Sequence, residues 1–193
     1  MPANKRVVIT GIGVLASNAI GKDDFWKAIR EGRSGIKPVT LFDTSTTRAK
    51  MAGEITDFRA EQFLGEKGLR TFDRVTKLVL SAAKLALDDA GLKAPLDEGL
   101  SVQTGVSLGS TLGSVRSISE FDKEGLRGGP RSVNPALFPN TVINAPASQI
   151  SIRFNIKGFN TTISTGFSAS LDAIDYAANF IKLYDYDIVL ASA

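Results

Sequence analysis

Apolar residues follow two spacings along the chain, and these spacings predict strands and helices in turn. Residues 5–14 are rich in β-branched side chains and end in Gly-x-Gly, which predicts a buried strand that runs into a turn. Residues 71–90 carry apolar side chains three and four positions apart, which predicts a long helix. Thr71 or Asp73 can cap the start of this helix, and Gly91 can end it.

The rest of the chain continues the alternation of strands and helices. A helix is expected to begin near Lys22, with Phe25 and Ile29 on its inner face and Trp26 as a further candidate for that face. The other expected elements are mostly loop with short elements over 36–70, strands over 101–108, 159–165 and 186–191, helices over 115–121, 145–154 and 168–183, and a loop over 125–141. This order predicts an α/β fold with a mostly parallel sheet and helices on both faces.

Composition narrows the chemistry that this chain can perform. Its 193 residues, 43% hydrophobic and 22% charged, suffice for one domain with a real core. The absence of Cys excludes disulfides, thiolate zinc sites and a cysteine nucleophile, and the absence of His excludes a Ser-His-Asp triad within the chain. We expect no metal and no cofactor.

Charge and hydropathy bear on partners and location. The net charge of +3 comes without a basic tract, so we expect no nucleic acid, whereas an acidic protein partner would suit this balance. No apolar run reaches the length of a membrane span, so we expect no membrane association and a cytoplasmic location.

Several short motifs have a structural explanation that outweighs the functional one. Gly11-x-Gly13 follows a predicted strand, but Ala16 stands where a dinucleotide fingerprint needs a third glycine. The glycines of residues 109–113 are not followed by the Gly-Lys-Ser/Thr of a phosphate-binding loop. Acidic residues expected on solvated helix surfaces, or without an obvious partner, are Asp23, Asp24, Asp88, Asp89, Asp172 and Asp175.

A set of stretches in a fixed order carries a family resemblance along the whole chain. They are residues 6–13 (RVVITGIG), 25–26 (FW), 31–36 (EGRSGI), 73–74 (DR), 82–83 (AA), 87–92 (LDDAGL), 109–113 (GSTLG), 140–144 (NTVIN), 147–151 (ASQIS) and 157–160 (KGFN). Together they resemble the β-ketoacyl-[acyl-carrier-protein] synthases, the condensing enzymes of fatty-acid and polyketide synthesis. The resemblance implies the thiolase-type fold, in which two similar α/β halves pack as five layers. It covers only the first half, so residues 1–193 are expected to form the N-terminal half, with the C-terminal half supplied as a separate chain.

The same resemblance implies where the active site would lie, and it shows that this sequence lacks the family's nucleophile there. The family places a nucleophilic Cys after a strand, at the start of a buried helix, where the helix N-terminus lowers the thiol pKa. Here Phe167 falls at that position, and a phenyl ring cannot attack a thioester, so we expect no acyl-enzyme and no catalytic residue. Thr165, Gly166, Phe167 and Ser168 are expected to form the elbow of a substrate pocket. An alternative explanation for Phe167 is an apolar side chain that fills a core void, and a ring at the elbow would also plug the acyl pocket. The family's two histidines lie in the half beyond this chain.

A ketosynthase-like chain without its Cys resembles the chain-length factors of type II polyketide synthases. The resemblance implies a noncatalytic subunit paired with a Cys-bearing ketosynthase, and a pocket that limits the chain made by decarboxylative Claisen condensation on an acyl carrier protein. The strand before the elbow would pair across the dimer, through Asn160, Thr161, Thr162, Ile163 and Ser164. Chain-length factors usually carry Gln where Phe167 stands, which argues against a decarboxylation role.

Two other functions stay open. One is an active acyltransferase or ketosynthase subunit with an unrecognised nucleophile, for which Ser168 and Ser170 flank the elbow. Without a His to activate it, a Ser at a helix start is more often a cap. The other is a structural subunit that docks the carrier protein through Lys and Arg. The sequence does not separate polyketide from fatty-acid synthesis, although the missing nucleophile favours polyketides.

Overall fold

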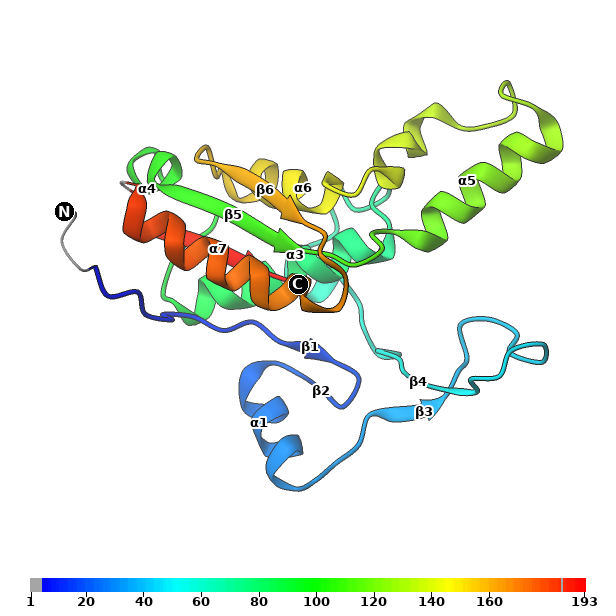
Figure 1. The fold of residues 1–193 in the computed structure, drawn as a ribbon, viewed down its shortest axis with the longest axis horizontal. Helices are drawn as coiled ribbons and strands as arrows, with labels where there is room; N and C mark the ends of the chain where they lie inside the picture. Colours follow the sequence, from blue (N-terminus) through cyan, green and yellow to red (C-terminus); the bar gives the residue numbers. More distant parts are fainter. Residues whose placement is uncertain (1–4, 185) are drawn as a thin grey trace.

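A three-stranded parallel sheet forms the centre of the computed structural model, which describes residues 5–184 and 186–193. Its strand order is β6 (Asn160–Ile163), β5 (Thr104–Gly109) and β7 (Ile188–Ser192). Two short antiparallel pairs lie outside it (Figure 1): β1 (Leu15–Ala16) with β2 (Ala19–Ile20), and β3 (Ile36–Pro38) with β4 (Met51–Gly53). The predicted parallel α/β sheet is confirmed.

Helices cover both faces of this sheet. Alternate residues of β5 point to opposite faces because the side-chain period of a strand is two. Val106 and Leu108 join the apolar cluster with α3 (Arg74–Asp89) and α6 (Ala145–Phe154), while the Ser107 hydroxyl donates to the Ala173 carbonyl of α7 (Ala169–Leu183) at 2.9 Å.

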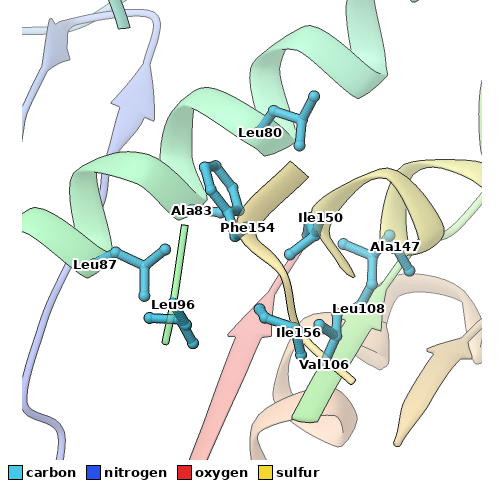
Figure 2. Close-up of a cluster of buried hydrophobic side chains, with 10 residues drawn as sticks. All are labelled: Leu80, Ala83, Leu87, Leu96, Val106, Leu108, Ala147, Ile150, Phe154 and Ile156. Atoms are coloured by element: carbon cyan, nitrogen blue, oxygen red, sulfur yellow. The ribbon is translucent and has the colours of Figure 1, made fainter. Parts of the chain in front are cut away.

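The buried apolar cluster lies between the sheet and the helix pair α3 and α6 (Figure 2). Its members are Leu80, Ala83, Leu87, Leu96, Val106, Leu108, Ala147, Ile150, Phe154 and Ile156. Leu80, Leu87, Val106 and Ile150 are almost wholly removed from water. Burial of such side chains is the main contribution to the stability of a domain.

The boundaries of α3 follow local capping chemistry. The Asp73 carboxylate accepts a hydrogen bond from the Thr76 backbone N–H at 2.9 Å at the start of α3, and Gly91, with φ of +71°, follows its end. The helix predicted over 145–154 is confirmed at both ends as α6. The remaining helices are α1 (Lys22–Arg30), α2 (Glu61–Leu64), α4 (Glu98–Gln103), α5 (Val115–Gly128), and 3-10 turns at Pro135–Thr141 and Gly166–Ser168. No described helix is long and apolar enough to cross a bilayer.

The loop predicted over 125–141 is wrong at both ends, because α5 occupies its first part and the 3-10 helix of Pro135–Thr141 its last part. Helix α5 continues through Gly125 and ends at Gly128, and Gly129, whose φ is +78°, follows it. Glycine weakens a helix without breaking it, and here the intervening Leu126 and Arg127 favour helix. The helix α4 was not predicted, although the Asp97 carboxylate caps it by accepting from the Leu100 N–H at 3.0 Å.

The strand predicted over residues 5–14 is also wrong. The segment is not assigned to a strand among the described residues, and it runs along α3 instead (Figure 1). A Cβ at Gly13 would lie 2.0 Å from the Ala82 carbonyl oxygen, so only glycine permits this approach. Val8 and Ile9, on the same segment, are 72% and 79% exposed. The hydrophobic pattern of residues 5–14 predicted a buried strand, but the described residues contain no neighbouring strand that pairs with this segment.

The inner face predicted for α1 is wrong in part. Trp26 and Ile29 are more than half exposed, whereas Ala28 is fully buried and Phe25 is half-buried. An apolar stripe on a helix predicts that the stripe is covered, but not which part of the protein covers it. In α1 the described chain covers Ala28 and leaves the larger Trp26 and Ile29 side chains exposed.

Candidate functional site

The predicted elbow lies between β6 and α7, beside the end of β5. After β6 the chain turns at Gly166, whose φ of +78° suits a residue without a Cβ. A 3-10 turn of Gly166–Ser168 then leads directly into α7. The structure therefore brings Thr165, Gly166, Phe167 and Ser168 together as one strand-turn-helix, as the pattern predicts.

One side of the elbow is fixed by the turn that follows β5. The Thr111 hydroxyl donates to the Gly166 carbonyl at 2.9 Å, and the Thr111 carbonyl accepts from the Ser164 hydroxyl at 3.3 Å. The Ser110 backbone N–H donates to the Ile163 carbonyl at 2.9 Å. The glycine turn of residues 109–113, which resembled a family motif, thus holds the elbow backbone in place.

The other side of the elbow is fixed by a carboxylate on α7. The hydroxyls of Thr165 and Ser168 both donate to Oδ2 of Asp172, the second at 2.9 Å. Asp172 therefore has two partners, although the sequence suggested none. The four-residue spacing of Ser168 and Asp172 could have predicted this contact, because side chains four residues apart lie on the same face of a helix.

These hydrogen bonds favour the ionised form of the Asp172 carboxyl group. The Thr165 hydroxyl first, and the Ser168 hydroxyl second, hold the pKa of Asp172 below its usual range, because both stabilise the ionised form. A carboxylate with a lowered pKa is a weak proton acceptor. The carboxylate that Ser168 contacts is therefore a weak base. Ser168 makes no side-chain cap hydrogen bond to α7, so the cap predicted for Ser168 is wrong.

A cavity of about 370 Å³ opens beside the elbow. Helix α3 contributes Val75 and Val79 to its wall, and Phe167 contributes from the elbow. The other lining residues come from β5 and its turn, from the elbow turn, from the starts of α6 and α7, and from the residue after β7: Leu108, Gly109, Ser110, Thr111, Leu112, Gly113, Gly166, Pro146, Ala169, Ser170 and Ala193. This wall is mostly apolar and contains no ionisable side chain, so it suits a hydrocarbon chain better than a charged group.

The Phe167 ring does not fill a void in the core. Its relative exposure is 103%, so the described chain covers none of it, although the residue contributes to the cavity wall. The core-filling interpretation is wrong. A fully exposed ring at a cavity wall is available to a partner or a ligand.

The strand predicted at a dimer interface occupies one edge of the sheet. Within the described residues β6 pairs with β5 alone, which leaves its other edge open (Figure 1). The Asn160 side chain turns toward α6, where its amide donates to the Ala147 carbonyl at 2.8 Å and to the Ser151 hydroxyl at 2.7 Å. These contacts hold the start of the strand. The described residues contain no group of three or more His, Cys, Asp or Glu side chains that could hold a metal ion.

Known proteins resemble this chain along nearly all of its length. Residues 4–193 match the family model described as "Beta-ketoacyl synthase, N-terminal domain". The "3-oxoacyl-[acyl-carrier-protein] synthase 2" of Coxiella burnetii is 34% identical over 187 residues, and that of Vibrio cholerae is 33% identical over 189 residues. These matches cover 97% and 98% of this chain but only 45% of each relative, so the chain spans less than half of their length.

Solved structures have the same arrangement of elements. "The ishigamide ketosynthase/chain length factor" is similar with a TM-score of 0.87 and 29% identity, over 99% of this chain and 48% of that one. A β-ketoacyl synthase from Burkholderia phymatum gives 0.80 and 27%, over 97% of this chain and 46% of that one. A type II polyketide synthase carrier protein in complex with its ketosynthase gives 0.79 and 23%, over 100% and 46%, and supports the fold alone.

Proposed function

This chain belongs to the β-ketoacyl synthase family, and we propose that it is a noncatalytic subunit, similar to a chain-length factor, of a ketosynthase complex. The observation that carries the proposal is Phe167, whose ring stands at the elbow where the family resemblance places a nucleophile. The chain contains no Cys and no His that could replace it. A similar solved structure bears the name ketosynthase/chain length factor, which is consistent with this role.

In this proposal the chemistry takes place on a partner. A Cys thiolate of the partner ketosynthase holds the growing acyl chain as a thioester. A malonyl unit on an acyl carrier protein loses CO₂, and the resulting carbanion attacks the thioester carbonyl and expels the thiolate. This chain supplies apolar surface that excludes water and limits the space for the acyl chain.

Two surfaces would serve assembly. The open edge of β6, from Asn160 to Ser164, offers backbone donors and acceptors to a strand of the ketosynthase partner. The exposed apolar side chains of residues 5–14 and of α1 would be covered by the C-terminal half of the family fold, acting as a separate chain.

An active subunit that uses Ser168 is the weaker candidate. Its hydroxyl donates to the ionised Asp172, whose lowered pKa makes it a weak base.

A subunit that only docks the carrier protein would bind that protein without changing the length of the product.

The test is co-expression with a Cys-bearing ketosynthase, a carrier protein and the C-terminal half. Native mass spectrometry reports the assembly, and mass spectrometry of the released products reports chain length. Phe167→Ala is expected to shift chain length, whereas Phe42→Ala is the matched control, since Phe42 is exposed but lies outside the cavity lining.

Each result has one meaning. An intact complex with unchanged products in the Phe167 variant contradicts a role in the pocket. Labelling of this chain by an acyl thioester, lost on Ser168→Ala, would establish the active-subunit alternative instead.

A further inference from the structure

Packing against the described chain does not fix the position of the Phe167 ring. The described chain covers none of the side chain, so burial contributes nothing to its orientation. Gly166, immediately before it, has φ of +78° and gives the backbone additional freedom. Within the described chain, the place of residue 167 therefore depends on the contacts that hold the backbone on its two sides.

Hydrogen bonds to one carboxylate bracket the ring. Thr165 lies two residues before Phe167 and Ser168 lies one residue after it, and both hydroxyls donate to Oδ2 of Asp172. Asp172 is in the first turn of α7, a 15-residue helix that packs on the sheet through Ala169, Ala173 and Ala177. The carboxylate thus connects a glycine-containing turn to a rigid element.

We propose that Asp172 is a positioning residue: it holds the elbow in one conformation and so keeps Phe167, one of the residues that line the apolar cavity, in place beside it. The Thr111 hydroxyl, which donates to the Gly166 carbonyl at 2.9 Å, assists from the opposite side. In the complex proposed above, this makes Asp172 a determinant of product length through the ring. That last step rests on the proposed function, whereas the positioning of the ring does not.

The test places a fluorescent reporter at the elbow of the full chain, co-purified with its partners. Trp26→Phe removes the one native tryptophan, and Phe167→Trp puts an indole at the position of the ring. Time-resolved anisotropy then reports motion of residue 167 on the picosecond-to-nanosecond scale. Asp172→Asn in this background is expected to shorten the local correlation time roughly twofold.

A matched control lies one helical turn further along α7. Asp175 also bears a carboxylate, which accepts from Asn179 at 2.9 Å and touches neither Thr165 nor Ser168 by hydrogen bond. Asp175→Asn is expected to leave the anisotropy unchanged. Thr165→Val should mobilise the indole, and Thr165→Ser, which keeps the hydroxyl, should restore the wild-type value.

The outcomes separate this inference from the proposed function. Unchanged anisotropy in both Asp172→Asn and Thr165→Val, or an equal effect in Asp175→Asn, would overturn the inference. Increased motion without a change in product length would support the positioning of the ring and contradict its role in chain length. Increased motion with altered products would support both.

Discussion

The backbone N–H of Ile12 donates to the Asp89 carboxylate at 2.9 Å, across 77 positions of the chain. The same carboxylate accepts from the Lys22 ammonium group, so one side chain at the end of α3 connects the first segment and α1 to the body. The sequence suggested a solvated surface position for Asp89. Instead it accepts a charge-assisted hydrogen bond from a backbone amide, a class of contact stronger than hydrogen bonds between neutral groups.

Removal of this carboxylate should release the first segment locally. In Asp89→Ala we expect faster hydrogen exchange at Ile12 and its neighbours, with little change at β5 in the centre of the sheet. Asp88→Ala is the control, because Asp88 pairs with Lys84 along the same helix and does not contact the segment. Amide exchange followed by mass spectrometry would decide, and equal exchange in the two variants would contradict the assignment.

The same carboxylate gives the fold an acid-sensitive contribution to stability. The Lys22 hydrogen bond first, and the Ile12 N–H second, hold the pKa of Asp89 below its usual value. Because the folded-state pKa lies below the unfolded one, this stabilisation is complete above the unfolded-state pKa and disappears as pH falls through the folded-state pKa. Urea denaturation of wild type and Asp89→Asn between pH 7 and acid would show the difference converge at low pH. A difference independent of pH would contradict this linkage.

Close approach of α7 to the sheet should make Gly109 sensitive to substitution. A Cβ there would lie 2.4 Å from the Ala169 carbonyl oxygen, a backbone atom that cannot move alone. Gly109→Ala is expected to cost about 1–3 kcal/mol in the free energy of unfolding, as overpacking does. Gly99→Ala, in α4, has the Asp97 carboxylate as its nearest neighbour at 3.4 Å and should instead gain roughly 0.5–1 kcal/mol. Chemical denaturation of both variants tests the contrast.

The exposure of Phe167 makes a further prediction about stability. Phe167→Ala should change the free energy of unfolding of the chain by less than about 0.5 kcal/mol, because no packing is lost. Phe154→Ala, at a buried core position, should cost about 3–5 kcal/mol. A large loss of stability in the Phe167 variant would show that the ring is packed.

Local patterns determined much of this protein. The period of apolar residues located α3, α6 and α7, and capping chemistry located the ends of α3, because helical spacing and caps involve residues that are close in sequence. The strand-turn-helix at residues 160–183 could be predicted for the same reason, and the missing Cys and His follow from composition alone.

Only the tertiary structure decided which faces are covered and which distant groups meet. The segment of residues 5–14 has the composition of a strand, but a strand needs a neighbour, and the described chain offers it α3 instead. Likewise Phe167 is apolar, yet its exposure depends on elements distant in sequence. The hydrogen bond from the Thr111 hydroxyl to the Gly166 carbonyl joins residues 55 positions apart. Burial and long-range hydrogen bonds are properties of the packed arrangement, so no local pattern of residues specifies them.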